Sequence, residues 1–208
     1  MAMNGLSHIH HFAPATTNGA PPLLLLHGTG GTEHDLVPLA QRLAPGAAIL
    51  SPRGRVSERG ANRFFARLAE GVFDPEEVTR RTHDLADFVI AACAQHGLDP
   101  RRLIALGYSN GANIAATLLQ LRPEILAGAV LLRPMVVLDR PAAADSLTGR
   151  RVLIASGTAD PLVPSSHPEG LAALLRTGGA DVTVHHSAAG HQLDAADLIA
   201  AGKFLQNG

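Results

Sequence analysis

Residues 103–121, LIALGYSNGANIAATLLQL, decide how the rest of the chain folds. The first four residues form a short apolar run that predicts a buried strand, and the apolar spacing from residue 112 onward predicts a helix. The turn between them has the Gly-x-Ser-x-Gly pattern of a nucleophile elbow, in which a strained turn projects the serine hydroxyl. We therefore expect Ser109 to be a nucleophile, with Gly107 and Gly111 needed because neighbouring backbone passes close to them.

The composition indicates a soluble globular domain. The 208 residues fit one domain spanning 1–208, in which residues 1–20 form an N-terminal edge strand and loop. With 17 Lys and Arg against 18 Asp and Glu, the formal net charge is −1 and nucleic acid is not an expected partner. No apolar run is long enough to cross a bilayer or to form a signal peptide, so no membrane association is expected. The single cysteine, Cys93, excludes an internal disulfide and favours a cytoplasmic location.

Apolar runs alternate with helical patterns along the chain. This order predicts an α/β fold with a mainly parallel central sheet and helices on both faces. Ligands of such sheets lie outside the carboxyl ends of the strands, so the loops that follow the strands should share one rim. The predicted strands that end at this rim finish at Leu26, Ser51, Leu106, Leu132, Ser156 and His186.

A serine nucleophile needs a base, and the base needs an orienting acid. Asp160 stands in a loop that follows a predicted strand, and His191 follows the last predicted strand, so both are expected at the rim with Ser109. The alternatives are that Asp160 is only a turn residue before a proline, and that His191 only starts the terminal helix. Competing acids and bases that do not stand in such a loop are Asp139, Asp145, His185 and His186.

The glycine-rich loop after the first buried strand suggests a second part of the site. It lacks the lysine and the spacing of a phosphate-binding loop, so no nucleotide is expected there. We expect the backbone N–H groups of Thr29 in this loop and of Asn110 after the serine to form an oxyanion hole. His27 is expected to fix this loop at the strand end, with a second base as the alternative.

Residues 54–75 read as irregular and are rich in arginine and phenylalanine, which predicts a cap over the pocket. Arginine binds carboxylates through two parallel hydrogen bonds, so a pocket for short esters with a carboxylate or an aromatic group is one hypothesis. The alternative is that these arginines pair with Asp or Glu and hold the loops. The candidate substrate-binding residues are Arg53, Arg63, Phe64 and Arg133.

Three histidines near the N-terminus, His8, His10 and His11, lie in a predicted edge strand over residues 6–12. No cysteine or carboxylate accompanies them nearby, so a solvent-facing edge is expected rather than a metal site. The chemistry predicted above also needs no metal and no organic cofactor.

Six segments together resemble the α/β-hydrolase superfamily: HGTGGTEHDLVPLA, SPRG, RFF, GYSNGAN, SGTADPLVP and GHQL. The similarity runs from about residue 20 to the end and is strongest to the small carboxylesterase/phospholipase group, which includes acyl-protein thioesterases and esterases encoded beside hydroquinone dioxygenases. It implies a single-domain α/β-hydrolase fold with a short cap loop and a serine esterase that cleaves a small-molecule ester. The implied nucleophile, acid, base and oxyanion donors are Ser109, Asp160, His191, Thr29 and Asn110.

Some positions depart from related groups. Acyl-protein thioesterases usually have Gln and Gly after the serine and Leu in the first loop, where this chain has Asn110, Gly111 and Thr29, so lipidated proteins are not expected substrates. Dienelactone hydrolases are also similar but carry cysteine where Ser109 stands, so dienelactone hydrolysis is not the expected activity. A thioesterase or lysophospholipase with the same triad and a non-catalytic small-molecule receptor remain alternatives. A homodimer is compatible with so small an enzyme, although no sequence feature indicates one.

Overall fold

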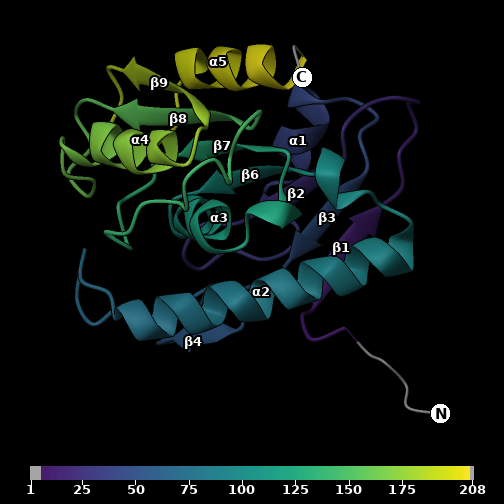
Figure 1. The fold of residues 1–208 in the computed structure, drawn as a ribbon, viewed down its shortest axis with the longest axis horizontal. Coiled ribbons are helices and arrows are strands. Elements are labelled where there is room, and N and C mark those ends of the chain that lie inside the picture. The colour runs from purple at the N-terminus through teal and green to yellow at the C-terminus, as the bar shows by residue number, and fades with distance from the viewer. Residues whose placement is uncertain (1–5, 207–208) are drawn as a thin grey trace.

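The structure, a computed structural model, describes residues 6–206, and a seven-stranded sheet runs through its middle (Figure 1). In space the strands follow the order β1-β3-β2-β6-β7-β8-β9. β1 runs antiparallel to β3, and the other neighbouring pairs are parallel, which confirms the predicted mainly parallel sheet. The strands are β1 (His10–Ala13), β2 (Leu23–Leu26), β3 (Ile49–Pro52), β6 (Ile104–Tyr108), β7 (Gly128–Leu132), β8 (Arg151–Gly157) and β9 (Asp181–Ser187).

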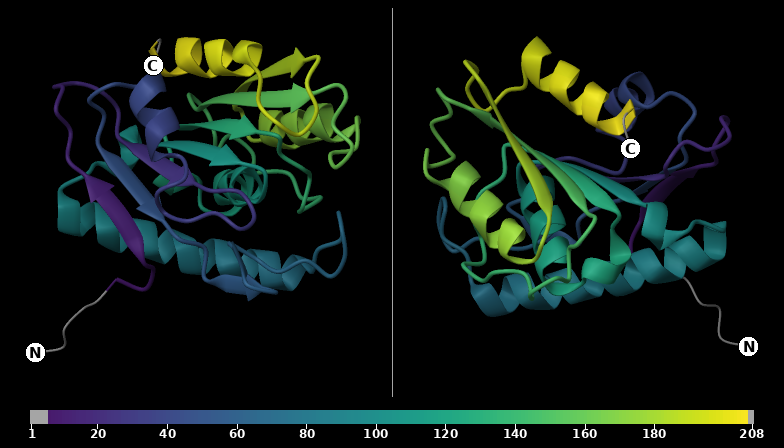
Figure 2. Two further views of the ribbon diagram at one scale, coloured as in Figure 1. Left: turned by 180° about the vertical axis from the view of Figure 1, so that it is seen from behind. Right: turned by 45° about the horizontal axis from the view of Figure 1, so that its top comes forward.

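Helices cover both faces of this sheet (Figures 1 and 2). α1 (Val37–Leu43) and α5 (Ala195–Gln206) pack on one face. The other face is covered by α2 (Pro75–His96), α3 (Asn110–Leu121) and α4 (His167–Thr177). The structure also contains the short 3-10 helices η1 (Pro100–Arg102) and η2 (Pro123–Ile125). No helix within residues 6–206 is both long enough and apolar enough to span a membrane.

Strand β2 shows why both faces must be covered. Successive side chains of a strand point to opposite faces, so the four leucines of β2 divide between the two layers. Leu24 and Leu26 lie in the core beneath α2 and α3, whereas Leu23 and Leu25 lie in the core beneath α1 and α5. All four side chains are fully buried, so β2 fixes the centre of the molecule and the place of the loop that follows it.

The N-terminal edge differs from the prediction. The strand β1 begins at His10, and residues 1–5 of the predicted N-terminal segment lie outside the described residues. His8 is buried rather than solvent-facing, because its ring packs against Phe88 with a centroid separation of 4.7 Å. This burial, together with the nearby charge of Arg55, lowers the pKa of His8 to about 4. Within residues 6–206, no group of three or more His, Cys, Asp or Glu side chains is arranged to hold a metal ion.

The segment 54–75, predicted to be irregular, contains a hairpin. β4 (Val56–Glu58) pairs antiparallel with β5 (Ala61–Arg63) in a sheet of two strands, separate from the central sheet. The turn residues Arg59 and Gly60 both have positive φ, 51° and 85°, as a two-residue hairpin turn that matches the strand twist requires. Because the first turn position is arginine rather than the usual asparagine or aspartate, the sequence signal for this hairpin is weak.

Candidate active site

Ser109 lies at the turn between β6 and α3, with φ 53° and ψ −116°. A non-glycine residue in this region is strained, as the Gly-x-Ser-x-Gly pattern predicts. A Cβ at Gly107 would lie 2.5 Å from the carbonyl oxygen of Gly111, and a Cβ at Gly111 would overlap the carbonyl oxygen of Leu26. Both positions therefore admit only glycine, and the backbone passes directly from the strand into the helix at the carboxyl edge of the sheet.

The structure brings Ser109, His191 and Asp160 together. The Nε2 atom of His191 lies 3.0 Å from the hydroxyl oxygen of Ser109, and its Nδ1 atom lies 2.8 Å from Oδ2 of Asp160. The other carboxylate oxygen of Asp160 accepts backbone N–H bonds from Leu162 and Val163, which fixes the carboxylate plane. With the Nδ1 proton directed at the carboxylate, Nε2 is left as the nitrogen that can accept a hydrogen bond from the Ser109 hydroxyl.

Close approach of two loops makes the Asp160–His191 contact possible. A Cβ at Gly157 would overlap the carbonyl oxygens of Ala189 and Gly190, and the N–H of Ala159 donates to the Ala189 carbonyl over 3.1 Å. The prediction that the terminal helix opens at residue 191 is wrong, because α5 begins only at Ala195. His191 instead lies in the loop over residues 188–194, where its imidazole faces the serine.

The competing acids and bases lie elsewhere in the fold. His185 and His186 belong to β9, and their nearest carboxylates, both 3.8 Å away, are those of Asp197 and Glu169. Asp139 and Asp145 lie in the segment between β7 and β8, where Asp145 occupies a turn with φ 60°.

His27 holds two loops together. Its Nδ1–H donates to the carbonyl of Gly28 over 2.7 Å, and its Nε2 accepts the N–H of Gly54 over 2.9 Å. Burial lowers the pKa of His27, which suits a neutral ring with one donating and one accepting nitrogen. This arrangement matches the expected loop-fixing role rather than a second base.

Both predicted oxyanion residues are tied to the cap by their side chains. Thr29 Oγ1 accepts a hydrogen bond from Nη1 of Arg63 over 2.5 Å, and Asn110 Oδ1 accepts the backbone N–H of Phe64 over 2.8 Å. Asn62 adds two further hydrogen bonds. Its backbone carbonyl accepts the N–H of Gly30, and its side-chain amide donates to the carbonyl of Gly31. The hairpin therefore braces the loop 27–32 beside Ser109, where the first N–H groups of α3 also point.

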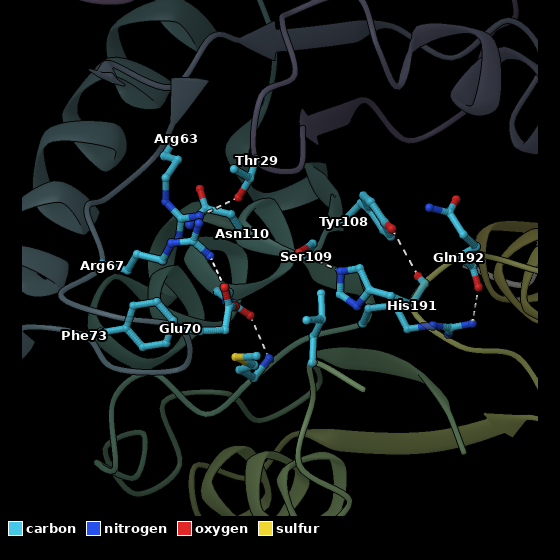
Figure 3. A pocket seen from close by; sticks show the side chains of 14 residues that line it. Thr29, Arg63, Arg67, Glu70, Phe73, Tyr108, Ser109, Asn110, His191 and Gln192 are labelled. Carbon is cyan, nitrogen blue, oxygen red and sulfur yellow. Dashed lines mark hydrogen bonds and ion pairs between the residues drawn. The ribbon is translucent and has the colours of Figure 1, made fainter. Parts of the chain in front are cut away.

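A pocket of about 320 Å³ opens over Ser109 (Figure 3). Its lining is mixed, because the cap contributes the charged Arg63, Arg67 and Glu70 together with the apolar Phe73. The lining residues are Thr29, Arg63, Arg67, Glu70, Phe73, Tyr108, Ser109, Asn110, Asn113, Arg133, Met135, Leu162, His191 and Gln192. Several of these escaped the sequence analysis, although Tyr108 and Gln192 stand next to Ser109 and His191 in the chain and Arg67 belongs to the arginine-rich segment.

Two of the predicted substrate-binding residues lie outside this pocket. Arg53 forms a bidentate pair with Glu33, with Nε–Oε2 2.6 Å and Nη2–Oε1 2.8 Å, as the loop-holding alternative proposed. Phe64 is 4% exposed, and its ring packs against His27 with a centroid separation of 4.8 Å. These positions favour the loop-holding alternative for Arg53 and a packing role for Phe64.

Arg63 and Arg133 do line the pocket, but both guanidinium groups are already engaged. Arg63 donates to Thr29 and, through Nε, to the carbonyl of Phe65 over 3.1 Å. Arg133 is 1% exposed and pairs with the fully buried carboxylate of Asp197. The pairing of Arg133 favours the alternative in which it holds the loops, whereas Arg63 remains part of the pocket wall.

Comparison with known proteins assigns the family. Residues 12–207 match the sequence model of the phospholipase/carboxylesterase group of α/β-hydrolases. The chain belongs to this family. This phospholipase/carboxylesterase family member is therefore a hydrolase of the esterase type, with the α/β-hydrolase fold that the sequence resemblance implied.

Individual members of the family are similar over most of their length. MhqD of Bacillus subtilis (strain 168), which is named as a hydrolase, is 47% identical over 171 residues, covering 82% of this chain and 85% of that protein. The crystal structure of the Bacillus cereus carboxylesterase has a TM-score of 0.93 and 43% identity, covering 97% of this chain and 94% of that one. The structure of YahD has a TM-score of 0.89 and 33% identity, covering 96% and 98%.

Proposed function

We propose that this protein is a serine carboxylesterase in which Ser109 attacks the ester, His191 acts as general base and then general acid, and Asp160 orients His191. The observation that carries the proposal is the continuous hydrogen-bonded chain from Asp160 Oδ2 through the imidazole to Ser109 Oγ, with links of 2.8 and 3.0 Å. This is the geometry that nucleophilic catalysis by a weak hydroxyl nucleophile requires.

The reaction then proceeds in two halves. His191 takes the hydroxyl proton as Ser109 attacks the carbonyl carbon, and the backbone N–H groups of Thr29 and Asn110 stabilise the negative oxygen. The imidazolium returns its proton to the leaving alcohol, which leaves an acyl group on Ser109. A water molecule deprotonated by His191 attacks this acyl-enzyme, and the acid is released as Ser109 regains its proton.

The size of the pocket supports small substrates. Its volume of about 320 Å³ is at the lower end of the range for small-molecule sites, so short-chain and small aromatic esters fit, whereas a long acyl chain would extend into solvent. Phe73, Met135 and Leu162 provide the apolar part of the lining. This favours a small-ester esterase over a lysophospholipase with the same triad.

A carboxylate on the substrate has a plausible partner in Arg67. The guanidinium of Arg67 pairs with Glu70, whose side chain is 57% exposed, and with Glu58 at 2.8 Å. An exposed ion pair contributes only about 0 to 1 kcal/mol, so a substrate carboxylate can replace Glu70 at little cost. The structure of the relative YahD was determined with malic acid, a small dicarboxylic acid, which is consistent with such a ligand.

Hydrolysis of p-nitrophenyl acetate by Ser109→Ala tests the proposal. The kcat should fall by at least about 10⁴-fold, because the nucleophile is lost. A fluorophosphonate probe should label the wild-type protein at Ser109 and leave the variant unlabelled. Ser166→Ala is the matched control, since this exposed serine makes no capping bond at α4 and its loss should leave both readouts unchanged. Retained turnover in Ser109→Ala would refute the assignment.

The substrate preference is tested by comparing esters that differ in one group only. A neutral methyl ester, its carboxylate-bearing analogue and the corresponding thioester should be compared in wild type and Arg67→Met. We expect Arg67→Met to reduce kcat/KM for the carboxylate-bearing ester by about tenfold and to leave the neutral ester within twofold. Equal effects on both esters would exclude carboxylate recognition by Arg67, and the sulfur ester shows whether the enzyme also acts as a thioesterase.

A further inference from the structure

The loop that carries His191 joins β9 to α5 and has no regular secondary structure over residues 188–194. Its backbone polar groups therefore need partners from outside the loop. Three consecutive carbonyl oxygens, those of Gly190, His191 and Gln192, accept hydrogen bonds from just two side chains, Arg133 and Tyr108. We propose that Arg133 and Tyr108 are positioning residues that fix the backbone on both sides of the catalytic imidazole.

The guanidinium of Arg133 spans the histidine from one side to the other. Its Nε donates to the carbonyl of Gly190 over 2.9 Å, and its Nη2 donates to the carbonyl of Gln192 over 3.0 Å. A planar fork with fixed donor directions holds two acceptors at a set separation, which an ammonium group on a flexible stem does not. The residues immediately before and after His191 are thus held by one rigid group.

Asp197 holds the other side of the same guanidinium. Its Oδ1 accepts from Arg133 Nη1 over 3.1 Å, and both side chains are fully buried. The carboxylate also accepts the backbone N–H of Asp194 over 3.0 Å, so it anchors the end of the loop as well. Arg133 is therefore fixed between the carboxylate and the loop, and its charge is balanced without any substrate.

Tyr108 supplies the third bond from the adjacent strand. Its hydroxyl donates to the carbonyl of His191 itself over 3.1 Å, and its ring lies beside the imidazole with a centroid separation of 5.5 Å (Figure 3). Tyr108 directly precedes Ser109 in the chain. One short segment therefore carries the nucleophile and holds the backbone of its base.

The backbone at Arg133 is shaped for this task. Arg133 directly follows β7 and has φ 57°, a left-handed conformation that a side chain tolerates only when its surroundings impose it. Among the described residues, Ser109 has a similarly positive φ at the end of the neighbouring strand β6. The two strained turns lie at the same edge of the sheet, one presenting the nucleophile and the other directing Arg133 beneath the histidine loop.

This inference rests on the proposed role of His191, and steady-state kinetics of Tyr108→Phe and Arg133→Lys test it. Tyr108→Phe removes one hydroxyl and keeps the ring, whereas Arg133→Lys keeps the charge opposite Asp197 and loses the fork. We expect kcat to fall about tenfold in Tyr108→Phe and about 100-fold in Arg133→Lys, with KM within twofold. Tyr108→Phe decides the question alone if Arg133→Lys does not fold.

Measuring both substitutions in the His191→Ala variant distinguishes a loss of histidine positioning from general damage to the fold. In His191→Ala, where no imidazole remains to be positioned, neither substitution should reduce the residual hydrolysis of p-nitrophenyl acetate further. Thr82→Val is the matched control, because it removes a buried 2.7 Å hydrogen bond between α2 and Thr117 of α3, neither residue lines the pocket, and the loss should lower stability with kcat unchanged.

The outcomes distinguish this inference from the proposed function. Equal losses in the wild-type and His191→Ala backgrounds, or a rise in KM with kcat preserved, would overturn the positioning role. Full activity of His191→Ala would instead refute the triad itself. Loss of activity in His191→Ala together with unchanged kcat in Tyr108→Phe and Arg133→Lys would leave the esterase proposal intact and reject only the positioning role.

Discussion

The two walls of the pocket are both built on arginine–carboxylate pairs, yet the pairs differ in burial. Behind His191, the side chains of Arg133 and Asp197 are 0% exposed. On the cap, Arg67 is 29% exposed and its partners Glu58 and Glu70 are 25% and 57% exposed. The first pair is held in one geometry because leaving it would strand a buried charge, whereas the second exchanges with solvent at little cost. Burial thus separates the wall that holds the His191 loop from the wall that the cap provides.

The largest effect is expected from breaking the buried pair. Asp197→Asn leaves the guanidinium of Arg133 without its counter-charge and should reduce the free energy of unfolding by about 3–5 kcal/mol. Urea unfolding at neutral pH measures this change. Glu70→Gln on the cap is the matched carboxylate-to-amide control, and a loss of equal size there would contradict the contrast between the walls.

Lowering the pH should weaken the buried pair between Arg133 and Asp197. Burial raises the pKa of Asp197, but the hydrogen bonds from Arg133 and Asp194 and the charge of Arg133 outweigh it, so the pKa lies below its usual value. A carboxyl group with a depressed pKa in the folded state stabilises the protein above its unfolded pKa of about 3.9 and loses that contribution as the pH falls through the folded value. The stability difference between wild type and Asp197→Asn should therefore shrink below about pH 4. A constant difference in urea midpoints down to pH 3 would argue against an ionised Asp197.

A smaller effect is expected where the cap braces the loop over residues 27–32. Thr29→Val removes the hydroxyl that accepts the 2.5 Å bond from Arg63 and keeps the backbone N–H. Since a hydrogen bond contributes about 1 kcal/mol, kcat/KM for p-nitrophenyl acetate should fall by about tenfold or less. In the Arg63→Met variant, Thr29→Val should cause no further loss of kcat/KM. Additive losses would show that the two side chains act independently.

The smallest effect is expected at the exposed pair itself. Glu70→Gln should change the free energy of unfolding by less than about 1 kcal/mol. By freeing Arg67, it should raise kcat/KM for a carboxylate-bearing ester relative to its neutral analogue. Chemical denaturation and matched-ester kinetics on one protein preparation provide both measurements, and a stability loss as large as that of Asp197→Asn would remove the distinction between the walls.

The elements of the fold follow from local patterns that the sequence displays openly. The leucine run of β2 predicts a strand covered on both faces, and Pro75 and Gly97 are typical of the start and end of a helix such as α2, where Gly97 has φ 68°. Hairpin β4–β5 escaped prediction because Arg59 occupies a turn position that asparagine usually fills. Local sequence specifies helices and strands well and unusual turns poorly.

Pairing between distant side chains is what the sequence leaves open. Arg133 reads as a substrate-binding residue because its partner Asp197 lies 64 positions further along, and nothing local relates the two. The chain order of Ser109, Asp160 and His191 predicts a shared rim, but their hydrogen-bond distances come only from the folded chain. Sequence patterns therefore locate the candidate groups, and packing determines which of them are already occupied.

Hairpin β4–β5 pairs only with itself and forms no part of the central sheet, so its register is independent of the strands that lead to Ser109, Asp160 and His191. Its tip at Arg59 and Gly60 is exposed. Insertions at that tip would therefore leave the central strands in alignment, which makes it a natural point for library design in enzyme engineering.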